Sequence, residues 1–346
     1  MQAYDLEGGF LPHWLFAIGP AFAVMPLALQ YFFAALFGLA IGSFLTVVIH
    51  RLPIMMERAW RADIAAEWAL QQAHPASEAV HSAAQASSST LSTSGADDEA
   101  QAETPPTEQH DKHLTEQTPY NLSLPRSACP SCGHQLTLSE NIPLISYLWS
   151  KGRCRACAHP IGPLYPIVEA LTMLMAMAVL WRFGAGWTAV ASFGLGAALI
   201  ALAFIDARTQ LLPDSITLPL LWVGLLLNLG STFVPLSDAV IGAAAGYLFL
   251  WLVYWIFRLV RGKEGMGYGD FKLLAALGAW FGWQALPQLI LLSAGAGAVL
   301  GLLAMARGRL KRDQTLPFGP YLAIAGVISL FLGDILLAWV APTLYS

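Results

Sequence analysis

Charged residues are scarce in this sequence. Only 12% of its 346 residues are Asp, Glu, Lys or Arg, whereas 56% are hydrophobic. A soluble domain usually contains about 25% charged and about 45–50% apolar residues, so this composition excludes an ordinary soluble globular protein. The net charge is −4, and no basic patch indicates a nucleic-acid partner.

Two familiar signals are also missing. Residues 1–14 contain no basic start followed by a short apolar core, as a cleavable signal peptide would. The first apolar run, from Trp14 to Ile49, is therefore predicted to contain an uncleaved transmembrane helix. No Gly-rich loop of the dinucleotide-binding type is present, and nothing in the sequence indicates an oligomeric state.

Long apolar runs, by contrast, are abundant. A helix needs about 20 apolar residues to cross a bilayer, so we predict an all-α polytopic membrane protein with about eight transmembrane helices. The expected spans are 27–48, 164–181, 187–205, 215–234, 239–257, 271–285, 286–306 and 321–341. The sixth is short and meets the seventh without a charged break.

The basic residues support this assignment of spans and give it an orientation. If the N-terminus lies outside, the inner segments and their borders hold all Lys and Arg residues except Arg182. Such an asymmetry is typical of the cytosolic side. We therefore expect three parts: 1–50 with the first span, a cytosolic region over 51–163, and a membrane domain over 164–346. Within the cytosolic region, 74–119 is predicted to be a disordered insertion because it lacks apolar residues.

The four cysteines form two CxxC pairs between the first and second spans. Cys129 and Cys132 are followed, after 21 residues, by Cys154 and Cys157. This spacing is typical of a zinc ribbon, in which two turns present four thiolates to a tetrahedral ion. Two disulfides are the alternative, but cytosolic thiols stay reduced. We predict a small zinc-ribbon-like domain whose metal is structural, because four protein ligands leave no position for a water.

Several acidic residues lie near or inside the spans, where such groups are expensive. Most have a local explanation. Asp214 and Asp238 precede apolar runs where an N-cap belongs. Glu169 lies near the start of the second span, where the helix dipole favours it. Asp334 stands alone toward the outer part of the last span.

Asp206 and Asp270 are the two candidates for chemistry. Asp206 ends the third span, so it cannot cap that helix, and the dipole there disfavours a negative charge. Asp270 begins the sixth span and could be an N-cap, but it follows a Gly-rich stretch that permits a close approach. The topology places both at one membrane surface, where two neighbouring carboxyls can share a proton and activate water.

At these residues the sequence resembles the type IV prepilin peptidases, a GxGD-type family of membrane aspartic proteases. The resemblance extends along the chain in order, through Gly42–Pro53, the CxxC pairs, Tyr165–Glu169, Asp206 with Leu212–Asp214, Gly267–Lys272 and Leu316–Pro320. It implies that Asp206 and Asp270 are catalytic. It also implies cleavage of the leader from type IV prepilins and type II secretion pseudopilins at the bacterial inner membrane.

The same resemblance implies methylation of the new N-terminus with S-adenosylmethionine. Thr46 stands where the family usually has Asn. Because the sequence has no Gly-rich cofactor loop of the dinucleotide type, methylation rests on the resemblance alone. A transporter with a zinc-binding cytosolic domain is the alternative function, but it predicts acidic residues near the bilayer midplane of inverted repeats. A scaffold without catalysis would explain the spans and zinc but not the paired aspartates.

Overall fold

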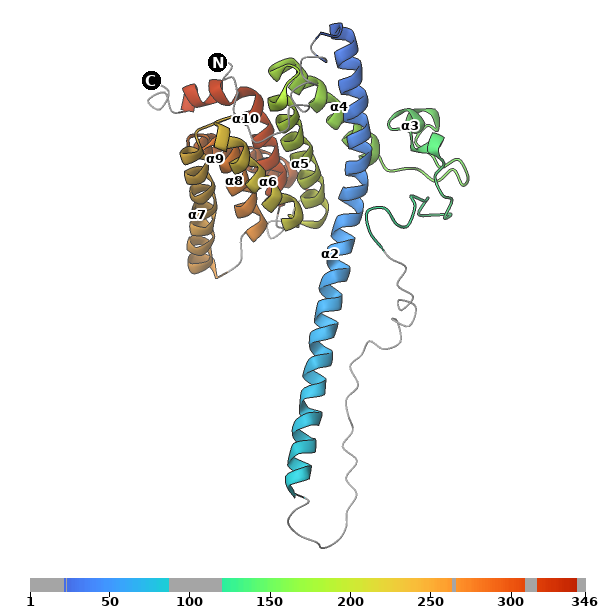
Figure 1. Cartoon of the computed structure of the whole chain (residues 1–346), viewed down its shortest axis with the longest axis vertical. Helices are drawn as coiled ribbons and strands as arrows, with labels where there is room; N and C mark the ends of the chain where they lie inside the picture. Colours follow the sequence, from blue (N-terminus) through green and yellow to red (C-terminus); the bar gives the residue numbers. More distant parts are fainter. Residues whose placement is uncertain (1–21, 23, 87–119, 263–265, 309–315, 341–346) are drawn as a thin grey trace. The chain divides into compact units, whose positions relative to one another are not determined.

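The computed structural model describes Phe22 and residues 24–86, 120–262, 266–308 and 316–340. These residues are helical apart from loops and two isolated bridges (Figure 1). The long helices are α2 (Leu27–Ala86), α4 (Leu164–Phe183), α5 (Trp187–Thr209), α6 (Asp214–Leu227), α7 (Leu236–Arg261), α8 (Tyr268–Phe281), α9 (Leu286–Ala306) and α10 (Gly319–Val340). Four short helices join them, namely η1 (Leu138–Asn141), α3 (Ile145–Trp149), η2 (Asn228–Gly230) and η3 (Trp283–Ala285).

All eight predicted spans correspond to helices, and the prediction of an all-α polytopic protein is confirmed. Six helices are long and apolar enough to cross a membrane: α2, α4, α5, α7, α9 with η3, and α10. The other two, α6 and α8, have 14 residues each and are shorter than a full span. Gly282, with φ +78°, separates α8 from the segment that leads into α9.

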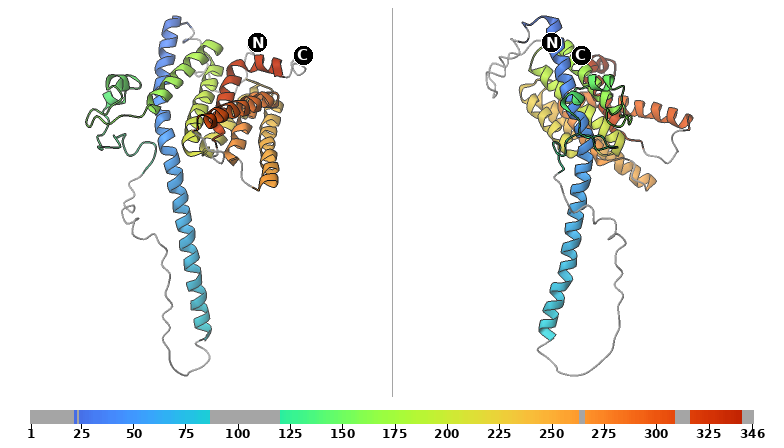
Figure 2. Two further views of the ribbon diagram at one scale, coloured as in Figure 1. Left: turned by 180° about the vertical axis from the view of Figure 1, so that it is seen from behind. Right: turned by 90° about the vertical axis from the view of Figure 1, so that its right-hand side faces the viewer.

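The short helix α8 is enclosed by other helices. Its residues from Asp270 to Trp280 are almost all buried, and it packs against α6, α7 and α10 (Figure 2). Trp280 anchors α8 to α6, because its indole N–H donates to the Leu220 carbonyl at 2.8 Å. Since protein covers α8, its length does not have to match the bilayer.

Glycines allow α7 and α8 to cross at close range. Gly242 and Gly246, spaced as GxxxG on α7, face Gly278 and Leu274 of α8. A Cβ at Gly246 would lie 2.9 Å from the Leu274 carbonyl oxygen, and Gly242 and Gly278 leave even less room for each other. Small residues at this spacing are the usual solution for tight helix packing in membranes.

A second buried cluster joins α2, α4 and α5. Its residues include Ile49, Val168 and Ile205. The helix α2 continues far beyond its apolar part, and residues 74–86 of the predicted insertion belong to it. The rest of that insertion, 87–119, lies outside the described residues.

The chain divides into two compact units, 1–53 with 127–346, and 54–126. The second unit contains the far part of α2 and the described segment 120–126. Within it, the Arg58 guanidinium lies 4.2 Å from the centre of the Tyr120 ring, and Arg61 pairs with Glu57 at 2.6 Å.

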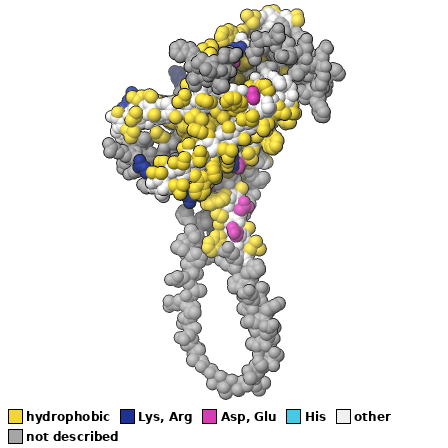
Figure 3. Space-filling view, turned by 90° about the vertical axis from the view of Figure 1, so that its left-hand side faces the viewer, with side chains coloured by type: hydrophobic (Ala, Val, Ile, Leu, Met, Phe, Trp, Pro, Cys, Tyr) yellow, Lys and Arg dark blue, Asp and Glu magenta, His cyan; other side chains and the backbone are white. Residues whose placement is uncertain are grey.

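The outer surface of the helical bundle is apolar. Hydrophobic side chains dominate the face in Figure 3, and charged side chains are few there. Exposed side chains on the long helices include Phe33, Leu174, Leu252 and Leu302. Such a surface is suited to lipid rather than water, and the protein is therefore a multi-pass membrane protein.

Candidate active site

Asp206 lies near the C-terminal end of α5 and is 5% exposed. Its Oδ2 accepts a hydrogen bond of 3.0 Å from the backbone N–H of Gly319, the first residue of α10. A helix N-terminus carries unpaired N–H groups and favours a negative charge. The negative charge of Asp206 is therefore disfavoured at the C-terminal end of α5 but stabilised by the N-terminal end of α10. The sequence did not reveal this contact with α10.

Asp270 is the third residue of α8 and is 6% exposed. The N-cap is Gly267, so the local alternative of Asp270 as the N-cap is wrong. The Gly267 N–H donates to the Asp270 carboxyl, but Oδ1 of Asp270 has no hydrogen-bond partner among the described residues. A buried acceptor of this kind is rare and often marks a functional site.

The two carboxyls are close enough for the charge on Asp206 to act on Asp270. One contact that brings their helices together involves Gly269, where a Cβ would lie 2.7 Å from the Cβ of Leu212 in the α5–α6 connection. The segments Leu212–Asp214 and Gly267–Lys272 of the resemblance therefore touch through a glycine. The expected close approach at the Gly-rich stretch is found here.

Asp214 has a partner that the sequence did not reveal. It is the first residue of α6, and the N-cap is Pro213, so the expected N-cap role is wrong. Both of its carboxylate oxygens accept hydrogen bonds of 2.7 Å from Lys272 Nζ on α8. This ion pair joins the starts of α6 and α8 beside the aspartates. Asp238 likewise lies after its N-cap, Pro235, and accepts a hydrogen bond from Gln284.

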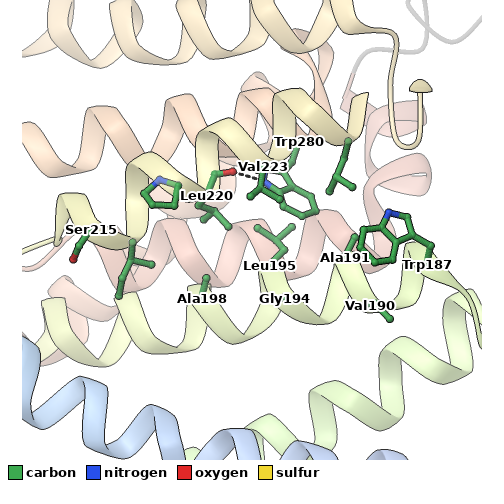
Figure 4. A pocket seen from close by; sticks show the side chains of 13 residues that line it. Trp187, Val190, Ala191, Gly194, Leu195, Ala198, Ser215, Leu220, Val223 and Trp280 are labelled. Carbon is green, nitrogen blue, oxygen red and sulfur yellow. Dashed lines mark hydrogen bonds between the residues drawn. The ribbon is translucent and has the colours of Figure 1, made fainter. Parts of the chain in front are cut away.

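An apolar groove of about 420 Å³ lies between α5 and α6 (Figure 4). Trp187 and Ser215 mark its two ends, and Trp280 of α8 lies between the helices. Pro219 interrupts the hydrogen bonding of α6 along the groove. Neither Asp206 nor Asp270 lines it, so the groove is not the candidate active site.

The four cysteines converge on one point. Their Sγ atoms all lie within 4.8 Å of one another, with 3.8 Å between Cys129 and Cys157 and 4.0 Å between Cys132 and Cys154. A tetrahedral zinc with Zn–S distances of about 2.3 Å separates its sulfurs by about 3.8 Å, so the set fits such an ion. None of the four forms a disulfide.

Two matching turns present these thiols. The N–H of Cys129 donates to the His134 carbonyl, and the N–H of Cys154 donates to the His159 carbonyl. Backbone N–H groups of Ser131 and Cys132 lower the pKa of the Cys129 thiol to about 7. The two turns therefore present all four sulfurs to one point, as a metal site requires.

Glu169 joins the cysteine-bearing segment to the membrane helices. It is 7% exposed, and it accepts hydrogen bonds from the Leu144 N–H at 2.7 Å and from the Ser43 hydroxyl. This contact is more specific than the expected helix-dipole stabilisation. One turn from Ser43, Thr46 donates its hydroxyl to the Ser43 carbonyl at 2.7 Å.

Fold and sites together define an all-helical, multi-pass membrane protein with two buried, interacting aspartates at helix ends and a separate four-thiol cluster. The chain belongs to the type IV leader peptidase family. The family model of that description matches residues 193–302, and a model described as the bacterial peptidase A24 N-terminal domain matches residues 36–183.

Relatives of this chain carry the description prepilin leader peptidase/N-methyltransferase. The protein of Burkholderia pseudomallei (strain 1026b) is 49% identical over 93% of this chain and 92% of its own length. That of Aeromonas hydrophila is 49% identical over 88% and 91%, and that of Pseudomonas aeruginosa is 48% identical over 86% and 89%. No solved structure matches the chain.

Proposed function

We infer that this protein cleaves the leader from prepilins and methylates the new N-terminus. The observation that carries the peptidase function is the buried pair Asp206 and Asp270, one carboxyl bonded to a helix N-terminus and the other with an unpartnered oxygen. The names of relatives that cover nearly the whole chain support both activities.

The two carboxyls divide the work of hydrolysis. Asp206 accepts the Gly319 N–H, which favours its charged form, and acts as the general base on a water. Asp270, whose Oδ1 has no hydrogen-bond partner among the described residues, holds a proton and donates a hydrogen bond to the peptide carbonyl oxygen. The water oxygen attacks the carbonyl carbon, and the tetrahedral intermediate then breaks at its C–N bond. The departing amine receives the proton that Asp206 took from the water.

The position of the pair suits a substrate in the same membrane. We propose that the ends of α5 and α8 bearing the aspartates face the cytosol of the bacterial inner membrane, on the side that holds 17 of the 18 basic residues. The scissile bond would then lie at the cytosolic end of an apolar segment of the prepilin or pseudopilin.

The second activity needs a methyl donor, and the proposed donor is S-adenosylmethionine. The relatives' names support the transferase, but the binding residues stay open because no known cofactor motif occurs in the sequence. The first part of the chain, including Thr46, is the region that the resemblance associates with methylation.

The metal of the cysteine cluster is proposed to be zinc with a structural role. Cys129, Cys132, Cys154 and Cys157 would hold it, and the ion would tie two loops of the segment into one small domain. No step of the hydrolysis involves it, because the ligand set is complete.

The function is tested with the purified protein and a prepilin in detergent, with and without S-adenosylmethionine. Mass spectrometry should find the cleaved product in both samples and a product heavier by one methyl group only with the donor. Asp206→Asn and Asp270→Asn should each abolish cleavage while the protein still inserts.

Asp334→Asn provides the matched control, because it makes the same change in a membrane helix away from the pair. Asp334 is exposed and lies 3.5 Å from Arg182, so this variant should process prepilin at the wild-type rate. Near-normal processing by either active-site variant would refute the aspartate pair.

A further inference from the structure

The helix α3 presents an apolar surface outward. Ile145, Leu148 and Trp149 recur at the spacing of one helix face, and Ile142 precedes them. Their exposed fractions are 53%, 69%, 79% and 43%, respectively. We call these four residues the α3 patch. Large apolar side chains clustered in this way indicate a surface that something covers.

The depth of α3 indicates what covers it. The Leu144 N–H, at the start of α3, bonds to Glu169 in the second turn of α4. Glu169 in turn packs on Gly42 of α2, where a Cβ would lie 2.7 Å from the Glu169 Cα. Arg51 is the first charged residue after the apolar part of α2. Gly42 lies about 13 Å before Arg51 along the helix, at about 1.5 Å per residue. The tether of α3 is therefore at the level of the apolar part of α2.

The backbone of Leu144 has an unfavourable conformation. Leu144 has φ +59°, a conformation that a residue with a side chain rarely adopts. The buried Glu169 carboxylate receives the Leu144 N–H and so keeps the chain turned toward α4. Ile167 and Leu171 of α4 are exposed and lie two residues before and two residues after Glu169. Exposed apolar side chains on a membrane-spanning helix face lipid.

The charges around the patch fit a membrane surface. Lys151 and Arg153 follow α3 directly, and both are exposed. Trp and basic residues are enriched where apolar chains meet lipid headgroups, because an indole has both apolar and polar parts and a cation attracts anionic lipid. Interfacial helices insert about 5–10 Å into this zone.

We propose that the α3 patch is a membrane-docking surface. It inserts into the lipid leaflet at the end of the first span where Arg51 lies, and it holds the cysteine cluster against the bilayer. The segment between the first two spans would then be attached to the membrane at a third place besides α2 and α4. A second copy of the chain, or residues 87–119, could also cover such a patch, and the experiment separates these occupants.

The test uses full-length protein in vesicles of phosphatidylcholine with a minor share of phosphatidylglycerol. A benzophenone amino acid replaces Trp149 in one variant and the exposed polar Gln135 of the same segment in another. Replacement of Phe44, which is 52% exposed on α2, sets the level for a lipid-facing position. After irradiation, mass spectrometry identifies the adducts.

Position 149 should form lipid adducts near the level of position 44 and several-fold above position 135. Adducts of position 149 to a second chain or to residues 87–119, or lipid labelling no higher than at position 135, would overturn the proposal. At positions 149 and 44 one aromatic side chain replaces another, and Gln135 is exposed, so these outcomes do not depend on a change of fold.

A second measurement follows the consequence of docking. Leu148→Ser/Trp149→Ser should raise amide hydrogen exchange over residues 127–161 in nanodiscs and leave α5 unchanged. Trp60→Ser removes another exposed tryptophan, from α2, and should change the exchange of neither region. Unchanged exchange in the double variant would contradict the proposal.

Discussion

Gly319 has no room for a side chain, because a Cβ there would lie 2.7 Å from Oδ2 of Asp206. Gly319→Ala must therefore move the carboxylate or the start of α10. A hydrogen bond to a charged group contributes about 1.5–3 kcal/mol, so we expect prepilin cleavage to fall about tenfold or more.

Gly295→Ala is the matched control for this substitution, because a Cβ at Gly295 meets nothing within 4 Å. Cleavage rates of the two variants, measured with thermal unfolding in the same detergent, separate a local effect from loss of fold. Wild-type cleavage by Gly319→Ala would show that the contact between Asp206 and α10 has no part in catalysis.

Asp214 provides a prediction in the opposite direction. Its side chain is 54% exposed and that of Lys272 is 28% exposed, and exposed ion pairs contribute about 0.2–1 kcal/mol. Asp214→Asn should therefore keep prepilin cleavage within about fivefold of wild type. If cleavage were lost as completely as in Asp206→Asn, Asp214 would be the true partner of Asp270.

At the scale of helices, the α7–α8 crossing determines where Asp270 lies. Gly242→Ala places a methyl group against the backbone of Gly278 and Gly282, and overpacking of this kind costs about 1–3 kcal/mol. We expect a lower unfolding temperature and slower cleavage, because α8 carries Asp270.

The control for the crossing is Gly194→Ala on α5, where a Cβ meets nothing within 4 Å. Replacing an unpacked helical glycine by alanine favours the helix by up to about 1 kcal/mol. Its unfolding temperature should equal or exceed that of the wild type. An equal fall in unfolding temperature in both variants would mean that the close crossing does not contribute to stability.

At the scale of the whole molecule, the peptidase and the metal cluster are separate sites. We expect metal analysis to find about one zinc per chain and Cys132→Ser/Cys157→Ser to lose it. Since the aspartates do not share ligands with the metal, this variant should still cleave prepilin faster than Asp206→Asn. A metal-free, active protein with intact thiols would contradict the zinc proposal.

The sequence by itself determined the helical class, the eight apolar segments and the spacing of four thiols, because these depend on composition and local periodicity. It also singled out Asp206 and Asp270 among the acidic residues, since helix capping and the helix dipole did not explain the positions of both carboxyls. The sequence did not predict which helices pack against α8, because an apolar segment of 14 residues can be a short span or an enclosed core helix.

Only the tertiary structure decided the partners of the charged groups. Asp206 accepts an N–H from Gly319, and Asp214 pairs with Lys272, across long separations in the chain. Neither pairing follows from local pattern, because the close approach of helices depends on absent Cβ atoms at positions such as Gly269 and Gly319. The same is true of Glu169, whose contact with the Leu144 N–H attaches the start of α3 to α4.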